Sequence, residues 1–116
     1  MREENEMIDG LFYFAHPYDS TNNTPAKNYQ LCNQRTVKLM DLGYMIFSPI
    51  THSHPLHVIK KHPSEFWMSL DRLIMPMCMG LILAPHWGES KGCMEEYTYF
   101  KTIGRMILLY EDLVKS

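Results

Sequence analysis

The sequence predicts a single-domain α/β protein with a three-layer, Rossmann- or flavodoxin-like fold, in which helices cover both faces of a parallel sheet of four or five strands. Its 116 residues suit one hydrophobic core. Short apolar runs alternate with segments that have helical features, and these runs are residues 11–15, 44–47, 80–84 and 106–110. Since each crossover between parallel strands must carry an element that covers the sheet, this alternation indicates parallel strands.

The first strand is predicted at residues 11–15, an apolar and aromatic run. The polar loop after it ends at Thr24 and Pro25, a good N-cap followed by a proline at the first helical position. We therefore expect a helix over residues 25–42, which ends at Gly43 because glycine suits the left-handed residue that closes many helices.

The second strand is predicted at residues 44–47. The His-rich segment 50–63 that follows is interpreted as a loop with at most one helical turn, because Pro55 and Pro63 interrupt it.

A second helix is expected to begin with Ser64 as its cap and to end at Pro76. Its apolar residues recur at helical spacing, and they are Phe66, Leu70, Leu73 and Ile74. The third strand follows at residues 80–84. A third helix begins near Ser90 and ends before Gly104, and residues 106–110 form a fourth strand with a short helical tail behind it.

Composition and charge exclude several classes of protein. Hydrophobic residues make up 46% of the chain and charged residues 21%, which is typical of globular proteins and not of disordered ones. The formal charge of −2 gives no overall field that would attract nucleic acid or an anionic membrane. We therefore expect neither as a partner.

The expected compartment is the cytoplasm. No apolar run approaches the roughly 20 residues that span a bilayer. The three cysteines, Cys32, Cys78 and Cys93, are odd in number and unclustered, and the first residues are charged instead of forming a signal sequence. We assign the cysteines to packing, because Cys78 and Cys93 fall beside or on apolar faces.

Ligands in open parallel sheets bind outside the carboxyl ends of the strands, which here means the segments that start at His16, Ser48 and Pro85. On the third helix, Cys93, Tyr97 and Phe100 form the apolar face, and Glu96 points toward the core or its edge. An inward carboxylate costs several kcal/mol unless it has a partner. Glu96 is therefore either a hydrogen-bonded structural residue or a functional one.

Two further features of the sequence carry weaker signals. Asp71 lies at the margin of the apolar stripe of the second helix, next to Trp67, where a carboxylate is either solvated or functional. Ser90 and Gly92 open the third helix, where a hydroxyl and free amides either hold a phosphate or simply cap the helix.

Four histidines, His52, His54, His57 and His62, raise the question of a metal. Their spacing matches no zinc pattern, so we expect no metal and interpret one or two of them as hydrogen-bond donors to a polar ligand.

Taken in order, four pieces of the chain carry a resemblance to a known family. They are YFAHPY at residues 13–18, SPITHSHP at 48–55, Asp71 in a helix, and WGESKGCMEE at 87–96. Together they resemble the nucleoside 2-deoxyribosyltransferase-like superfamily, and within it the DUF1937 group. The resemblance covers residues 11 to about 110, and its most specific piece is Ser-x-Gly-x-x-x-Glu, met by Ser90, Gly92 and Glu96.

The resemblance implies a domain over residues 11–112, after an N-terminal extension at residues 1–10, that cuts or transfers the N-glycosidic bond of a nucleoside or nucleoside 5′-monophosphate. By position, Glu96 would be the nucleophile that attacks C1′, Asp71 would orient the sugar and assist proton transfer, and Tyr13 would be the tyrosine that ends the first strand. The expected substrate-binding residues are Ala15, His16, Pro17, Pro49, His52, His54, Trp87, Ser90 and Gly92. No cofactor is implied, and a homodimer or higher homo-oligomer is expected.

Two residues depart from the pattern of that family. His16 stands where the family usually has Gly or Ser, and it would alter the substrate or add an acid/base group near pH 7. Met79 stands where the third strand usually opens with Asp, which indicates packing or an altered subunit contact.

Two other functions remain open. A binding module could keep the pocket without performing chemistry. Cleavage of a larger nucleotide such as NAD is disfavoured by the small size of the chain.

Overall fold

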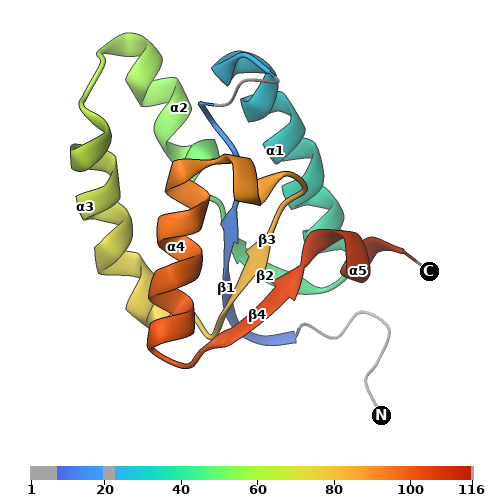
Figure 1. Ribbon diagram of the computed structural model, residues 1–116. Coiled ribbons are helices and arrows are strands. Elements are labelled where there is room, and N and C mark those ends of the chain that lie inside the picture. The colour runs from blue at the N-terminus through green and yellow to red at the C-terminus, as the bar shows by residue number, and fades with distance from the viewer. Residues whose placement is uncertain (1–7, 20–22, 116) are drawn as a thin grey trace.

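A four-stranded parallel sheet in the order β2-β1-β3-β4 forms the centre of the computed structural model, which describes residues 8–19 and 23–115 (Figure 1). The elements are β1 (Ile8–Ala15), α1 (Pro25–Asp41), β2 (Tyr44–Phe47), α2 (Pro49–Ile59), α3 (Ser64–Ile74), β3 (Gly80–Leu83), α4 (Lys91–Thr102), β4 (Met106–Leu109) and α5 (Tyr110–Val114), with 3₁₀ turns at Met75–Met77 and Trp87–Glu89. The predicted α/β fold with a parallel sheet is confirmed, and β1 begins three residues earlier than expected.

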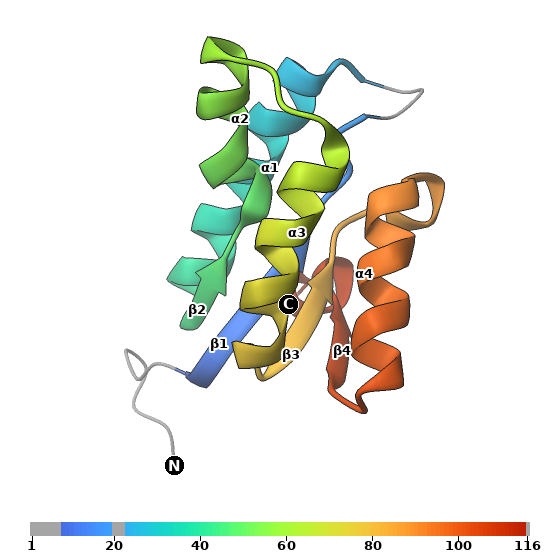
Figure 2. The ribbon, with the colours of Figure 1, turned by 90° about the vertical axis from the view of Figure 1, so that its left-hand side faces the viewer.

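Helices cover both faces of this sheet. Successive residues of β1 point to opposite faces, and the residues on both sides are apolar, so each face must be covered. Tyr13 and Ala15 join a core cluster with residues of α4, while Phe12 and Phe14 join a second cluster with residues of α1. Figures 1 and 2 show α3 and α4 on one face and α1 and α5 on the other, with α2 beside α1. The three layers thus follow from the apolar character of β1 on both of its faces.

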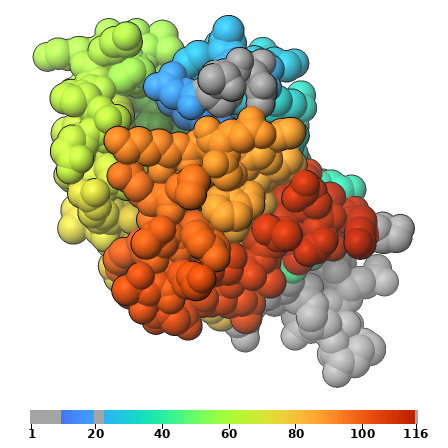
Figure 3. Space-filling view, viewed as in Figure 1, coloured from blue at the N-terminus to red at the C-terminus, as the bar shows by residue number. Residues whose placement is uncertain are grey.

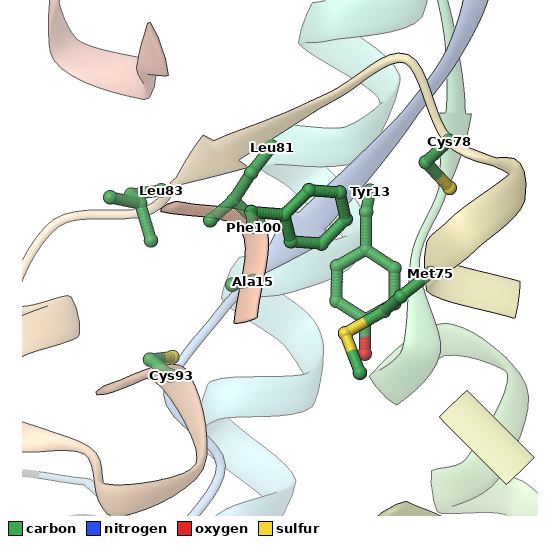
Figure 4. Packing of buried hydrophobic residues seen from close by; sticks show 8 residues of the cluster. All are labelled: Tyr13, Ala15, Met75, Cys78, Leu81, Leu83, Cys93 and Phe100. Carbon is green, nitrogen blue, oxygen red and sulfur yellow. The ribbon is translucent and has the colours of Figure 1, made fainter. Parts of the chain in front are cut away.

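The core on the α4 side is built around Tyr13. Figure 4 shows its ring between Phe100 and Met75, and the ring centroids of Tyr13 and Phe100 lie 5.6 Å apart. All three side chains are at most 2% exposed. A tyrosine in this position needs a partner for its hydroxyl, because an unpaired buried hydroxyl is costly.

Gly10 lets the chain pack closely beside the start of the third strand. Its φ of +95° is strained for other residues, and a Cβ there would lie 2.6 Å from the Sδ atom of Met79. Met79 therefore packs over Gly10, which supports the interpretation of this residue as a packing substitution.

The structure contains a helix where the sequence predicted a loop. The expectation of at most one helical turn in residues 50–63 is wrong, since α2 spans 11 residues. Pro49 occupies the first turn, where no N–H is required. Pro55 lies inside the helix and removes one bond to the carbonyl of Thr51, but both residues are exposed and water can satisfy that carbonyl.

The two predicted N-caps at the other helix starts are confirmed. Thr24 accepts a hydrogen bond from the amide of Lys27 at 3.1 Å, and Ser90 accepts one from the amide of Cys93 at 3.2 Å. Ser64, however, is the first residue of α3 and not its cap, which is Pro63.

The α3 helix buries only part of the apolar stripe that its pattern predicts. The helix contains no fully buried residue, and Phe66 and Leu73 are 48% and 72% exposed. Leu70 and Ile74 are half-buried, and Ile74 packs against the core on the side of the helix that carries Trp67 and Asp71 toward the cavity. The edge of the stripe formed by Phe66 and Leu73 is therefore an outer surface in the single chain.

Among the described residues, no helix has the length and the apolar character that a bilayer crossing requires.

Candidate active site

A cavity of about 1090 Å³ opens at the carboxyl ends of the strands, where open parallel sheets bind their ligands. Its wall comes from the segment after β1, from α2 and α3, and from the first half of α4. Figure 3 shows the surface hollowed between the green α2, the blue segment after β1 and the orange α4. Of the residues that the sequence analysis singled out, His16, Pro49, Asp71, Ser90, Gly92 and Glu96 line this cavity.

Glu96 reaches the cavity from the buried face of α4. It is 7% exposed and lies one helical turn from Cys93 and Phe100, which anchor that face in the core. The hydroxyl of Tyr13 donates a hydrogen bond to Oε2 of Glu96. The inward orientation that helical spacing predicted for Glu96 is confirmed, whereas its neighbour Glu95 is exposed.

Glu96 and Asp71 form a pair of carboxyl groups whose pKa values are both raised. Burial raises the pKa of Glu96 to about 8; the Tyr13 hydrogen bond opposes the rise, and the charge of Asp71 adds to it. Burial also raises the pKa of Asp71 to about 6, against a hydrogen bond with the same tyrosine. Interacting groups titrate as a pair, so one proton is shared between them near neutral pH.

Tyr13 joins the two carboxyl groups. Burial raises the pKa of its hydroxyl well above 10, and the charges of Glu96 and Asp71 raise it further. The hydroxyl therefore stays protonated and acts as a hydrogen-bond donor. The strand β1, the helix α3 and the helix α4 thus each bring one of the three predicted catalytic side chains to the same place.

His16 is held as a neutral ring with a defined tautomer. Its Nδ1 lies 2.8 Å from the carbonyl oxygen of Pro17 and must donate to it, while its Nε2 lies 2.9 Å from Nη1 of Arg35 and must accept. Burial and the Arg35 charge lower the pKa of His16 to about 4, although the bond to Pro17 opposes this. The suggestion that His16 adds an acid/base group near pH 7 is therefore wrong.

The start of α4 presents polar groups to the cavity. Ser90 is 6% exposed and uses its Oγ as the N-cap. A Cβ on Gly92 would meet only that Oγ, at 3.9 Å, so the glycine borders open space. Lys91 is exposed at the same edge of the cavity.

Five of the residues expected to bind substrate do not line the cavity. Ala15 and Pro17 are buried at the end of β1, and His52 is exposed on α2. The Nδ1 of His54 lies 2.7 Å from the hydroxyl of Tyr18. Trp87 packs on Tyr97, with 4.8 Å between the ring centroids.

Other residues of α2, α3 and the segment between them line the cavity although the sequence analysis did not name them as substrate-binding residues. They include His57, Lys61, His62 and Trp67. The interpretation of residues 50–63 as a loop concealed the position of His57. The place of Trp67 could have been predicted, because this residue precedes Asp71 by four positions and therefore lies on the same face of α3.

The cysteines offer no nucleophile, as expected from their assignment to packing. Burial raises the pKa of Cys93 to about 12 and that of Cys78 to about 11, and all three cysteines are buried. Within residues 8–19 and 23–115, no three His, Cys, Asp or Glu side chains converge on a position that would hold a metal ion.

A family model supports one part of the resemblance seen in the sequence. The model described as "Domain of unknown function (DUF1937)" matches residues 10–112, which include every residue of the cavity wall. No curated protein matches the chain. Because the matched segment is most of the sequence, the chain belongs to the DUF1937 family.

Proposed function

We propose that this protein cleaves or transfers the N-glycosidic bond of a nucleoside or nucleoside 5′-monophosphate, with Glu96 as the nucleophile. The observation that carries the proposal is the meeting of Glu96, Asp71 and the Tyr13 hydroxyl at one cavity. Paired carboxyl groups with raised pKa values are typical of sites where one group acts as acid and the other as nucleophile or base.

The reaction begins when a carboxylate oxygen of Glu96 attacks C1′ of the sugar. The C1′–N bond breaks, its electron pair leaves with the base, and the base takes a proton from Asp71. A glycosyl ester on Glu96 results, as in retaining glycosidases. In a hydrolase, water then attacks C1′, gives a proton to the carboxylate of Asp71 and displaces Glu96 as the C1′–O ester bond breaks. In a transferase a nitrogen of a second base attacks C1′ instead, with the same transfer of its proton to Asp71 and the same release of Glu96.

Tyr13 stabilises the charged form of Glu96 before the attack. Its hydroxyl donates to Oε2 and has no accessible ionised form, so the negative charge stays on the carboxylate. As the ester forms, Glu96 loses that charge. Tyr13 then orients the ester carbonyl without taking part in proton transfer.

The reactive form of the pair has an ionised Glu96 and a protonated Asp71. Burial raises the pKa of both groups, and that of Glu96 the more, so burial by itself does not favour this form. A base that accepts a hydrogen bond from protonated Asp71 favours it, because the proton is then retained on Asp71 while Glu96 is ionised.

The test compares Glu96→Gln with Glu95→Gln across a panel of nucleosides and 5′-monophosphates, with free base followed by chromatography. Both variants remove one carboxylate from neighbouring positions of α4, but only Glu96 lies in the buried pair. We expect Glu96→Gln to abolish base release and Glu95→Gln to retain it. Base release by Glu96→Gln at the parent rate would contradict the proposal.

A binding module without chemistry is the second candidate. The raised pKa of Glu96 favours it, because a protonated carboxyl is no nucleophile. Calorimetry would then show nucleotide binding by the parent protein, while chromatography shows an intact glycosidic bond after long incubation.

We also propose that the protein assembles as a homodimer or a higher homo-oligomer. The exposed edge of α3 and the turn that follows the helix carry large apolar side chains, since Phe66, Leu73 and Met77 are 48%, 72% and 68% exposed. An exposed apolar stripe on an otherwise ordinary helix is typical of an interaction surface. A second copy of the chain would cover it.

A further inference from the structure

The imidazole ring of His57 on α2 accepts two hydrogen bonds at one nitrogen. The indole Nε1 of Trp67 donates to Nδ1 of His57 at 3.1 Å, and the backbone amide of His62 donates to the same atom at 3.2 Å. An indole N–H and a backbone N–H are donors only. The Nδ1 of His57 must therefore be unprotonated.

This arrangement fixes the tautomer of His57. A proton on Nδ1 would face two other N–H groups, so the ring carries its proton on Nε2. None of the residues described in the structure accepts a hydrogen bond from that Nε2–H. The protein thus fixes the orientation of the His57 ring, and the Nε2–H of that ring has no acceptor among the described residues.

The position of His57 relates it to the carboxyl pair. His57, Trp67 and Asp71 all line the cavity. Trp67 and Asp71 are four residues apart on α3, which places them on one face of the helix at about 6 Å along its axis. Trp67 therefore links His57 to the helix face that carries Asp71, the group from which the leaving group would take its proton.

We propose that His57 recognises the departing base of the substrate, by donating from Nε2 to a carbonyl oxygen or an unprotonated ring nitrogen on a planar heteroaromatic ring. The inference rests on the proposed function, since it assigns the partner of His57 to the leaving group of that reaction. Trp67 is the positioning residue, because it fixes the tautomer and adds an aromatic wall beside the base.

The chemistry of the donor favours a base over a phosphate. A phosphate is bound best by cationic donors that present several N–H groups, whereas His57 uses Nδ1 as an acceptor and offers a single N–H at Nε2. A neutral N–H directed at a neutral acceptor instead discriminates strongly between rings that carry the acceptor and rings that lack it, because the mismatched complex leaves a donor unpaired.

The test is calorimetry at pH 7 with free bases, namely adenine, hypoxanthine, thymine and cytosine, and with 2-deoxyribose 5-phosphate as a probe of the sugar and phosphate. His57→Phe keeps an aromatic ring but removes both nitrogens. His52→Phe is the matched control, because His52 lies on the same helix outside the cavity wall. Circular dichroism confirms that each variant is folded.

We expect the parent and His52→Phe to bind at least one base equally, and His57→Phe to bind it about three- to tenfold more weakly, which is the effect of one hydrogen bond. The affinity for 2-deoxyribose 5-phosphate should stay unchanged. The inference is overturned if the parent binds none of the bases, if His57→Phe binds them with parent affinity, or if only the sugar phosphate loses affinity.

A second measurement tests the tautomer directly. In long-range ¹⁵N–¹H spectra of the parent, Nδ1 of His57 should give the shift of an unprotonated nitrogen and Nε2 that of a protonated one. Trp67→Phe should shift the tautomer equilibrium toward Nδ1–H and weaken base binding. Base binding that depends on His57, in a protein that releases no base from any nucleoside, would refute the proposed reaction and leave the recognition by His57 standing.

Discussion

Two histidines in the cavity wall are held in opposite tautomers, each by its immediate partners. Pro17 and Arg35 keep the proton of His16 on Nδ1, whereas Trp67 and the amide of His62 keep that of His57 on Nε2. Neither residue can be recognised from the sequence as a donor or an acceptor, because partners distant along the chain decide the tautomer. Burial gives the pair of Asp71 and Glu96 raised pKa values in the same cavity wall.

The pKa values of the pair predict a bell-shaped dependence of kcat/KM on pH. Below about pH 6 both Asp71 and Glu96 are protonated and no nucleophile exists, and above about pH 8 both are ionised and no acid remains. The measurement is the initial rate of base release at saturating and low substrate across this range. A rate that rises without a maximum up to pH 10 would exclude Asp71 as the acid.

The raised pKa of Glu96 also makes the free energy of unfolding depend on pH. Its pKa in the folded protein is about 8 against an ordinary value of 4.5, so the folded state binds the proton more tightly. Stability is therefore lost as the pH rises from the ordinary pKa toward the folded one. The free energy of unfolding of Glu96→Gln, relative to the parent, should increase by about 2 to 4 kcal/mol between pH 5 and pH 9.

Urea denaturation at several pH values measures this difference. Glu95→Gln serves as the control, because Glu95 is exposed and its replacement should leave the pH dependence of stability unchanged. A constant difference between Glu96→Gln and the parent across the range would show that the pKa of Glu96 is ordinary.

At the scale of elements, the helix caps provide a matched pair of sites. Ser90 caps α4 beside the cavity, and Thr24 caps α1 on an exposed loop. Ser90→Ala and Thr24→Ala should each lower the free energy of unfolding by about 1 kcal/mol, since each removes one capping bond. Only Ser90→Ala should also weaken the binding of nucleoside 5′-monophosphates.

The measurements are urea denaturation and calorimetry with a 5′-monophosphate and its nucleoside. If Ser90→Ala weakens nucleoside and monophosphate equally, the serine contacts the sugar or base and not the phosphate. If neither ligand is affected, Ser90 is a cap alone.

The elements differ in how far the sequence predicts them. The strands and the helices α1 and α4 follow from local signals, namely apolar runs, caps and closing glycines, and the position of Glu96 follows from the periodicity of α4. The α2 helix was missed because Pro55 and Pro63 were interpreted as breakers, whereas Pro55 is accommodated inside the helix at an exposed position and Pro63 caps α3. With α2 unrecognised, the place of His57 in the wall could not be predicted.

At the scale of the whole molecule, one face of α3 lines the cavity and another exposes apolar side chains. Its apolar stripe predicts a core face, yet the single chain leaves Phe66 and Leu73 of that stripe exposed and directs Trp67 and Asp71 to the cavity. Periodicity locates an apolar stripe but does not tell whether the same chain or another covers it. This ambiguity is resolved if copies of the chain cover one another.

Replacement of Leu73 by Lys tests the proposed assembly. The side chain is 72% exposed in the single chain, so the variant should fold, with a melting temperature within a few degrees of that of a monomeric parent. Analytical ultracentrifugation should show an oligomer for the parent and a shift toward monomer for Leu73→Lys. Val37→Lys, on the exposed side of α1, is the control and should leave the oligomeric state unchanged. A parent protein that sediments as a monomer at all concentrations would contradict the assembly.

The weak attachment of α3 to the rest of the chain has a consequence for the cavity that this helix lines. The helix that carries Asp71 and Trp67 has no buried side chain of its own, so its hold on the sheet comes from partly buried contacts of Met68 and Ile74. If a second copy steadies it, the order of the cavity wall depends on mass action. Turnover per molecule should then fall when the protein is diluted and recover when it is concentrated, which makes the abundance of the protein a regulator of its own rate.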